Sequence, residues 1–500
     1  MRSRFPLESS FLLTNILLFV VVAATYVYFQ WNDLSNWDLR FYSFGGIDFI
    51  DHPKLYDRVY MDKPPLAFLL YAPMKFLPGI GGQAVFFAFV IAGELLMLRW
   101  LLRELQYDEA ACLGGAVFFL VATFFKYQLD YVSLEHLTNL LVLGACVAMV
   151  RGSKPDVIIA GALIAASFYI RQNNVIFALY PLLLGRFTGF KIWFLYAAAI
   201  LGGFVALLGF FSVISNTDLF LYTTFVYPFK YAGIGIGGAP TAFSETILTL
   251  ALAKLSFGPL LLFLVLWCVA ALTRTTLRVS AGRMIAIFAV AFVVMAAPNK
   301  AFNHYQGYLL IWLGLLGACT VQVLSPLLLG RQRLLWLSAA CVSVFLAAVV
   351  QKERTSRGEL SPAKGRLDII MPELRNALAS RAGHPTLQVF DPVYSDHGIS
   401  DGLVMALSGA RPANPLFATL FYAEWLAPAL PLELRQPWDL PARNPPDIVL
   451  LIDLGASASL AYMGPKFVES VDQFLDSHAY NRRWVADEII IASRPRVSPD

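Results

Sequence analysis

Apolar stretches of membrane-spanning length recur along the first 350 residues of this 500-residue chain. They lie at 10–29, 83–103, 109–125, 135–150, 156–171, 175–189, 191–213, 245–271, 284–298, 305–327 and 334–350. Only a helix satisfies its own backbone polar groups inside lipid, and a helical span needs about twenty apolar residues. The composition agrees, because 58% of the residues are hydrophobic and only 14% are charged. The sequence therefore predicts a polytopic α-helical membrane protein with about 11 transmembrane helices.

Basic residues between the apolar stretches predict how the chain is oriented. Lys and Arg are found at alternate connections, near residues 2–4, 99–103, 151–154, 186–191, 274–283 and 331–333. Cytoplasmic loops carry such an excess in multispanning proteins. We therefore expect a multi-pass protein of the inner (plasma) membrane with a cytoplasmic N-terminus. The first loop at 30–82, the loop at 215–244 and everything after residue 350 are then extracytoplasmic, or periplasmic.

The composition changes after residue 350, where the apolar stretches end. β-rich runs at 386–390, 447–452 and 488–493 alternate there with helical runs such as MPELRNALASRAG and PKFVESVDQFLDSHA. Alternating strands and helices are typical of α/β folds. The chain is therefore expected to consist of a transmembrane part at 1–350 and a small extracytoplasmic α/β domain at 351–500.

The first loop gathers charged residues between two membrane segments. These are Asp33, Asp38, Asp48, Asp51, His52, Asp57, Asp62 and Lys63. Most of the acids are expected to be solvated charges that keep the loop out of lipid. Asp38 differs because it follows Trp37 in a stretch predicted to form an interfacial helix, where an idle carboxylate is costly. Lys63 precedes two prolines, which are expected to begin a helix whose amide groups face an anion.

The same loop resembles a known class of enzymes. An acid near the end of the first span is followed by a glycine, by Leu-Tyr and by KPPL before an apolar helix; here these are Asp38, Gly46, Leu55, Tyr56 and 63–66. This pattern resembles the GT-C class of membrane glycosyltransferases. Within that class it is most similar to the bacterial branch related to protein O-mannosyltransferases and to the lipid A aminoarabinose transferase. Members often carry Asp-Glu at the first-loop site, whereas Leu39 follows the acid here.

The resemblance implies transfer of a sugar from a polyprenyl-phosphate donor to an extracytoplasmic lipid, glycan or protein, with inversion at the anomeric carbon. Such chemistry needs a carboxylate to take the acceptor proton and a cation to stabilise the leaving phosphate. We expect Asp38 to be the base and Lys63 to bind the donor phosphate. Two residues at the ends of later spans, Arg171 and Tyr305, are expected to assist. Further candidates are Tyr56, Asp62 and His304.

Three local features carry alternative interpretations. Arg171 is expected either to have a functional or buried partner or to reach the membrane surface by snorkelling. Glu135 and His136 begin an apolar stretch, where an acid suits the N-terminus of a helix without any further role. The loop at 215–244 is expected either to close over lipid or acceptor or to be a plain connector at the interface.

Other functions remain open from the sequence. A lipid-linked sugar flippase or a transporter would place charges along a path in mid-membrane, whereas this chain keeps most of its charge at the ends of its apolar stretches. A non-catalytic membrane subunit would need neither Asp38 nor Lys63. The sequence requires no cofactor; a divalent metal ion on Asp62, His52 or His304 is compatible with the resemblance, but no ligand spacing calls for one. The formal net charge of +4 gives no reason to expect nucleic acid.

Overall fold

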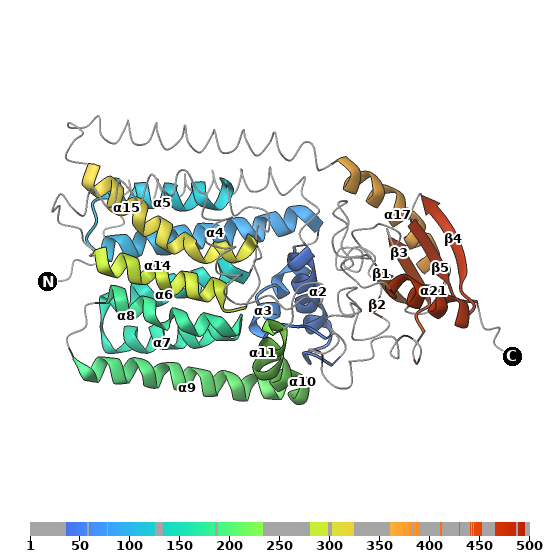
Figure 1. Cartoon of the computed structure of the whole chain (residues 1–500), viewed down its shortest axis with the longest axis horizontal. Coiled ribbons are helices and arrows are strands. Elements are labelled where there is room, and N and C mark those ends of the chain that lie inside the picture. The colour runs from blue at the N-terminus through green and yellow to red at the C-terminus, as the bar shows by residue number, and fades with distance from the viewer. Residues whose placement is uncertain are drawn as a thin grey trace.

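The structure is a computed structural model in which the chain forms a bundle of long helices and a five-stranded sheet flanked by helices (Figure 1). It describes residues 37–57, 60–77, 79–125, 134–185, 189–233, 281–298, 303–324, 361–381, 385–390, 411–412, 430, 441, 443, 445–452, 466–486 and 489–495. The spans predicted at 10–29, 245–271 and 334–350 lie outside these residues.

The body of the bundle consists of helices that coincide with predicted apolar stretches. In the described residues these are α4 (Gly79–Glu104), α5 (Glu109–Phe125), α6 (Leu134–Arg151), α7 (Lys154–Phe168), α9 (Phe190–Ile214), α14 (Ala281–Ala296) and α15 (Leu310–Leu324). Helix α15 packs on α5, and α7 packs between α6 and α9. Three of the described helices, Val85–Glu104, Leu134–Arg151 and Phe190–Ile214, are long and apolar enough to cross a membrane. The count of about eleven spans stays a prediction.

The apolar stretch at 175–189 differs from the single span predicted there. It is divided into a 3-10 helix, η3 (Gln172–Ala178), and the short helix α8 (Leu179–Leu184). Pro181 lies in the first turn of α8, where its missing N–H group needs no partner. A proline is tolerated at that position but not in a helix interior, so the α-helix begins here instead of running through.

Basic residues form ion pairs at one end of the bundle. There the guanidinium of Arg151 lies 5.6 Å from the ring centroid of Trp100 and 3.8 Å from the carboxylate of Asp156. Arg103 pairs with Glu109 at 2.9 Å at the neighbouring turn between α4 and α5. These basic residues belong to loops that the sequence assigns to the cytoplasm. The structure gathers them at one end, and the side of the membrane stays a prediction.

The first loop is helical over much of its described part. It contains α2 (Trp37–Asp51), α3 (Leu66–Leu69) and the 3-10 helix η1 (Ala72–Lys75), so the helix predicted around Asp38 is confirmed. Gly46 brings α2 against the backbone that follows α3. A Cβ atom at this position would lie 2.5 Å from the carbonyl oxygen of Phe68 and 2.6 Å from the amide nitrogen of Ala72. Only glycine allows this approach.

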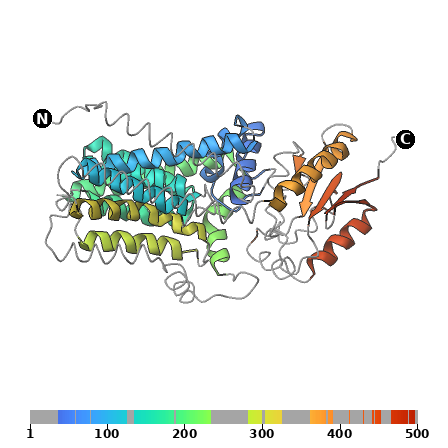
Figure 2. The same ribbon diagram turned by 90° about the horizontal axis from the view of Figure 1, so that it is seen from above.

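The segment at 215–233 is also helical and lies at the same end of the bundle as α2 and α3 (Figures 1 and 2). It forms α10 (Thr217–Leu221), the π-helix η4 (Tyr222–Val226) and α11 (Tyr227–Ala232). Leu55 joins it to the first loop, because its amide donates to Ile214 and its carbonyl accepts from Asn216, both at 2.8 Å. The remainder of the predicted loop, 234–244, lies outside the described residues.

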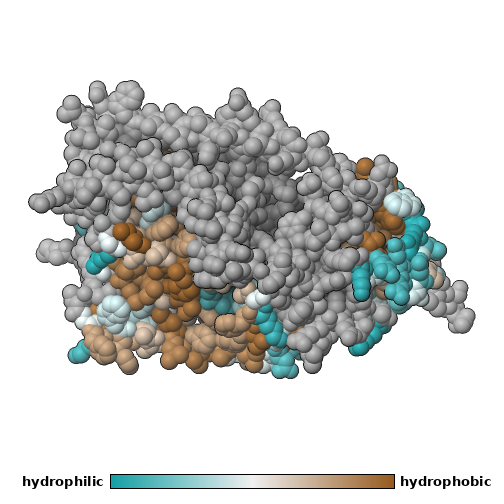
Figure 3. All heavy atoms as spheres, in the orientation of Figure 1, coloured by the Kyte–Doolittle hydropathy of each residue, from teal (hydrophilic) through white to brown (hydrophobic). Residues whose placement is uncertain are grey.

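Helix α9 presents a broad apolar face. Its buried side chains in the described structure are Tyr196 and Phe211, while Leu201, Val205 and Val213 are more than half exposed. Figure 3 shows hydrophobic side chains gathered on this part of the surface. Such a face is expected of a helix that contacts lipid.

The C-terminal part contains a mixed sheet. Its strands are β1 (Thr386–Phe390), β2 (Arg411–Pro412), β3 (Ile448–Ile452), β4 (Asn481–Ala486) and β5 (Ile489–Ser493), in the order β2-β1-β3-β5-β4. Strands β2, β1 and β3 are parallel, and β5 and β4 continue the sheet in antiparallel fashion. The helices beside it are α17 (Ser361–Ala379) and α21 (Phe467–Ser477). Strands β1, β3 and β5 coincide with the predicted runs. The domain boundary and its extracytoplasmic location stay predictions.

Candidate functional site

Lys63 is held in place by two other residues that the sequence singled out. Its side chain forms an ion pair with Asp62, and its backbone carbonyl accepts a hydrogen bond of 2.5 Å from the hydroxyl of Tyr56. The side chains of Lys63 and Asp62 are 17% and 11% exposed. Tyr56 has φ of +60°, a backbone conformation that a non-glycine residue adopts only when its surroundings impose it. The chain therefore fixes this lysine with some local strain.

The helix after Lys63 begins where it was predicted but does not offer its amides to an anion. Pro65 is the N-cap of α3, which is only four residues long. The amide of Leu66 donates to the carbonyl of Tyr169 at 3.0 Å, and the next amide donates to Pro64 at 3.1 Å. The prediction of an anion-facing helix terminus is therefore wrong, because these donors are already used. The bond to Tyr169 instead joins the first loop to the end of α7.

Arg171 is buried inside the bundle. Its Nη1 donates to Oε1 of Glu135 at 2.5 Å, and its guanidinium lies 4.6 Å from the ring centroid of Tyr305. Arg171 is 6% exposed and Glu135 is fully buried. A charge among apolar helices requires a partner of this kind. The expectation of a buried partner is confirmed, and snorkelling to the surface is wrong.

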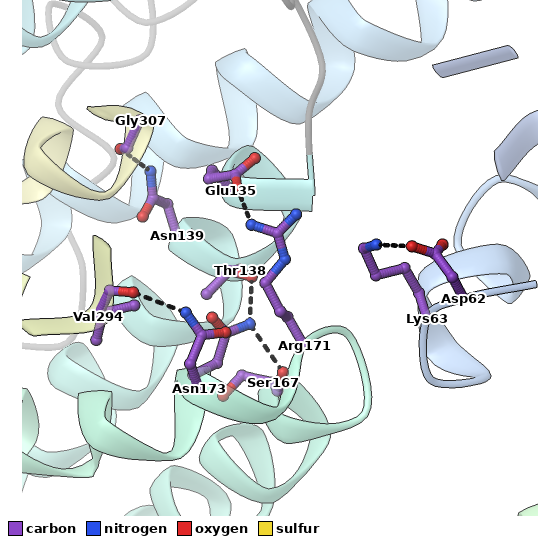
Figure 4. A network of polar contacts seen from close by, with 11 residues as sticks. Asp62, Lys63, Glu135, Thr138, Asn139, Ser167, Arg171, Asn173, Val294 and Gly307 are labelled. Carbon is purple, nitrogen blue, oxygen red and sulfur yellow. Dashed lines mark hydrogen bonds and ion pairs between the residues drawn. The ribbon is translucent and has the colours of Figure 1, made fainter. Parts of the chain in front are cut away.

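A layer of amide side chains fixes the backbone around Arg171 (Figure 4). Asn174 donates to the Thr138 hydroxyl at 2.7 Å and to the Ser167 carbonyl at 3.0 Å. Asn139 donates to the carbonyl of Gly307 at 3.0 Å. These bonds join η3 to α6 and α7, and α6 to the 3-10 helix η7 (Asn303–Leu309), which carries Tyr305. The position of Arg171 is thus determined by several elements together.

The two ion pairs lie at the same end of the bundle. Figure 4 shows Lys63 and Asp62 on the first loop and Arg171 and Glu135 on the helices of the bundle. The phenol of Tyr42 lies within electrostatic range of the guanidinium, and a further tyrosine, Tyr227, lies within range of both Tyr42 and Asp62. Two cations and several phenols from distant parts of the sequence therefore lie at one end of the bundle.

Two of these phenols are kept protonated. Burial, followed by the nearby Tyr60 and Asp62, raises the pKa of Tyr56 well above its ordinary value. Burial and then Asp62 raise the pKa of Tyr227 in the same way. The hydroxyl of Tyr227 is buried and has no hydrogen-bond partner among the described residues. A protonated phenol donates one hydrogen bond, and Tyr56 already donates its own to the Lys63 carbonyl. Of the two, the phenol of Tyr227 is therefore the one that can donate to an oxygen atom of a ligand.

Asp38 and His304 are placed only by their backbone. Asp38 is the second residue of α2 and His304 is the second residue of η7, and their side chains lie outside the described structure. Their roles stay predictions. Within the described residues, no group of three or more His, Cys, Asp or Glu side chains is arranged to hold a metal ion. His52, a candidate metal ligand from the sequence, has its Nδ1 atom 3.6 Å from a carboxylate oxygen of Asp48.

Sequence reasoning missed a second buried pair close to the first. Nδ1 of His136 lies 2.8 Å from Oε2 of Glu94, and these residues are 3% and 0% exposed. Glu94 lies inside the apolar stretch of α4, and an acid at such a position is the signal that points to a buried partner. The sequence suggested Glu135 only as an acid at the N-terminus of a helix, whereas the structure makes it the buried partner of Arg171.

No protein-family model and no curated protein matches the sequence. Solved structures do resemble the chain, among them two crystal structures of ArnT from Cupriavidus metallidurans. The one bound to undecaprenyl phosphate is 13% identical, with 98% of this chain and 100% of that chain covered and a TM-score of 0.54. The chain has the ArnT fold. The apo structure of ArnT gives 13% identity, coverage of 96% and 99%, and the same TM-score of 0.54.

The ArnT fold confirms the fold that the resemblance to the GT-C class implied. The archaeal oligosaccharyltransferase AglB from Archaeoglobus fulgidus, in complex with an inhibitory peptide and a dolichol-phosphate, is also similar to this chain. It is 12% identical, with 96% of this chain and 74% of that chain covered and a TM-score of 0.49.

Proposed function

We propose that this chain is an integral membrane glycosyltransferase that moves one sugar from a polyprenyl-phosphate donor to an extracytoplasmic acceptor, with inversion at the anomeric carbon. The observation that carries the proposal is the fold shared, over 98% of the chain, with an ArnT structure bound to undecaprenyl phosphate. The presence of Lys63 and Arg171 at the same end of the helix bundle supports it, because a phosphate needs fixed cations. The acceptor is a lipid, a glycan or a protein.

In this proposal Lys63 and Arg171 bind the donor phosphate. The planar guanidinium is stacked on Tyr305 and suits bidentate contact with phosphate oxygens, whereas the lysine acts as a point charge. The hydroxyl of Tyr56 keeps Lys63 in position through the backbone. The lipid tail extends along the apolar helices, and the phosphate then lies at the headgroup level, where the first loop meets the bundle.

The proposed reaction is a single displacement. The oxygen of an acceptor hydroxyl forms a bond to the anomeric carbon while the bond from that carbon to the phosphate oxygen breaks, through a transition state with oxocarbenium character. Asp38 takes the acceptor proton, and the phosphate oxygen keeps the electron pair of the broken bond. Lys63 and Arg171 stabilise the charge that grows on the phosphate. The products are the glycosylated acceptor and a polyprenyl phosphate.

We further propose that residues 351–500 form an extracytoplasmic domain that contacts the acceptor or packs against the helix bundle. The hydroxyl of Tyr222, in the π-helix at the site end of the bundle, donates to the carbonyl of Leu430 at 2.9 Å. This bond supports the proposal because it links the helices around the site to the C-terminal part.

The test uses purified protein in lipid with a panel of polyprenyl-phosphate sugars and crude membrane acceptors. We expect turnover of one donor, and a loss of about 10²–10⁴-fold in the Asp38→Asn variant, because the proton acceptor is gone. The control is Asp57→Asn, which changes an aspartate of the same loop whose side chain is 46% exposed. Full activity in Asp38→Asn would remove this residue from the mechanism. Absence of turnover with every donor would overturn the proposed function.

A further inference from the structure

Each cation of the site already has its own carboxylate. Lys63 is paired with Asp62, and Arg171 is paired with Glu135. The four side chains together carry two positive and two negative charges, so the two pairs have no net charge. A site that only had to bind phosphate tightly would leave its cations without acidic partners, because each acid next to the phosphate repels it.

Glu135 is fixed more firmly than an ordinary ion-pair partner. A Cβ atom at Gly307 would lie 3.0 Å from Cβ of Glu135, so η7 is packed directly against this side chain. Asn139, one turn further along α6, ties the same helix to the Gly307 carbonyl. Glu135 is fully buried, and its Oε2 has no hydrogen-bond partner among the described residues. Its negative charge therefore stays beside Arg171 when a phosphate arrives.

The two lipid phosphates of the proposed reaction differ in charge. The donor is a phosphodiester with one negative charge. The leaving polyprenyl phosphate is a monoester, whose second ionisation near pH 6 gives it about 1.5 to 2 negative charges at pH 7. Repulsion by a fixed charge is proportional to the charge of the ligand. A buried carboxylate beside the phosphate site therefore weakens binding of the product more than binding of the donor.

We propose that Glu135 is a positioning residue that also promotes product release, by holding Arg171 in place while its own charge selects against the dianionic phosphomonoester. This inference rests on the proposed function. It identifies the charge of Glu135 as the property by which the site distinguishes the donor from the product. Asp62 has the same relation to Lys63 on the first loop.

The test measures binding rather than turnover, in protein reconstituted in nanodiscs. The probes are undecaprenyl phosphate and its methyl ester, a monoester and a diester, at about pH 8, where the monoester is mostly a dianion. Glu135→Gln keeps the shape of the side chain and removes its charge. We expect diester binding to tighten about tenfold and monoester binding about a hundredfold, because the effect doubles with ligand charge. Glu135→Asp should restore the wild-type ratio of the two affinities.

Controls separate the inference from the proposed function. Glu373→Gln, which changes an acid paired with the exposed Arg483 beside the C-terminal sheet, should leave both affinities unchanged. If Glu135→Gln does not fold, Asp62→Asn provides the same measurement on a partly exposed pair. An unchanged ratio, or equal weakening of both lipids, would show a structural role alone and overturn the inference while the proposed donor stands. A wild-type protein that binds neither lipid would overturn both.

Discussion

Arg171 and Lys63 are cations in two different settings. Arg171 is 6% exposed, inside the bundle, and touches Glu135 and Tyr305. The side chain of Lys63 is 17% exposed and lies on a loop that is tied to the bundle by hydrogen bonds of its backbone. A buried guanidinium has a fixed orientation, whereas an ammonium on a flexible stem adjusts to its ligand. We therefore expect Arg171 to determine where the phosphate lies and Lys63 to follow it.

Lys63→Gln should weaken binding of undecaprenyl phosphate by about tenfold or more, because a charge-assisted hydrogen bond is lost. The measurement is a binding titration in nanodiscs at two salt concentrations, since the loss of a cation also reduces the salt dependence. Lys54→Gln is the matched control, because Lys54 is on the same loop and its side chain is 57% exposed. Equal binding by the Lys63 variant and the control would exclude Lys63 from the phosphate site.

At the residue scale, the sequence predicted single candidates but not their pairing. Lys63, Tyr56 and Asp62 were found because they are close together in the chain and stand before two prolines. The pairs Glu135–Arg171 and Glu94–His136 join different elements, separated by 36 and 42 residues. Hydropathy and spacing report which residues lie in a span, and they carry no information on which faces of two spans meet. The sequence therefore allowed a buried partner for Arg171 to be expected, but it could not identify Glu135 as that partner.

At the scale of elements, glycine positions distinguish tight contacts from free surface. We expect Gly46→Ala to destabilise the protein by about 1–3 kcal/mol, because its Cβ would meet backbone atoms that cannot turn aside. Gly202 of α9 has nothing within 4 Å of a Cβ, so Gly202→Ala should be neutral or stabilising by up to about 1 kcal/mol. The measurement is the thermal unfolding midpoint in the same detergent. A Gly46 variant as stable as the Gly202 variant would contradict the close approach of α2.

The helices whose bounds agree with the predicted stretches are those whose ends follow from hydropathy alone. The stretch at 109–125 corresponds to α5, Glu109–Phe125, and 191–213 corresponds to α9, Phe190–Ile214. The stretch at 175–189 is as apolar, but Pro181 and the polar residues that precede it divide it. The segment 215–233, predicted only as a connection between spans, is also helical and contains the π-helix η4 between two short α-helices. Hydropathy does not report such short helices outside the spans.

At the scale of the whole molecule, the site and the C-terminal sheet lie beyond the same end of the bundle, opposite the basic end (Figures 1 and 2). We therefore expect the sheet and the site to face the same side of the membrane. This expectation concerns sidedness alone and is independent of the chemistry proposed for Lys63.

Cysteine labelling in intact cells tests this arrangement. In a background without the five native cysteines, Glu469→Cys on α21 should react with a membrane-impermeant maleimide. Lys154→Cys at the N-terminus of α7 should react only after the membrane is permeabilised. Both positions are exposed, so access to the reagent decides the result. Labelling of both residues from outside, or of Lys154→Cys alone, would contradict the predicted orientation.

The order of residues in the Glu135–Arg171 pair has a consequence for how the protein is made. The carboxylate is synthesised 36 residues before the guanidinium that it binds. A charged side chain that enters a membrane without a partner is costly. Because α6 with its acid precedes η3, the ribosome delivers the arginine into a membrane that already contains its counter-charge. Tyr305 is added last, so the end of the bundle that holds Arg171 is completed only when the chain is more than half synthesised.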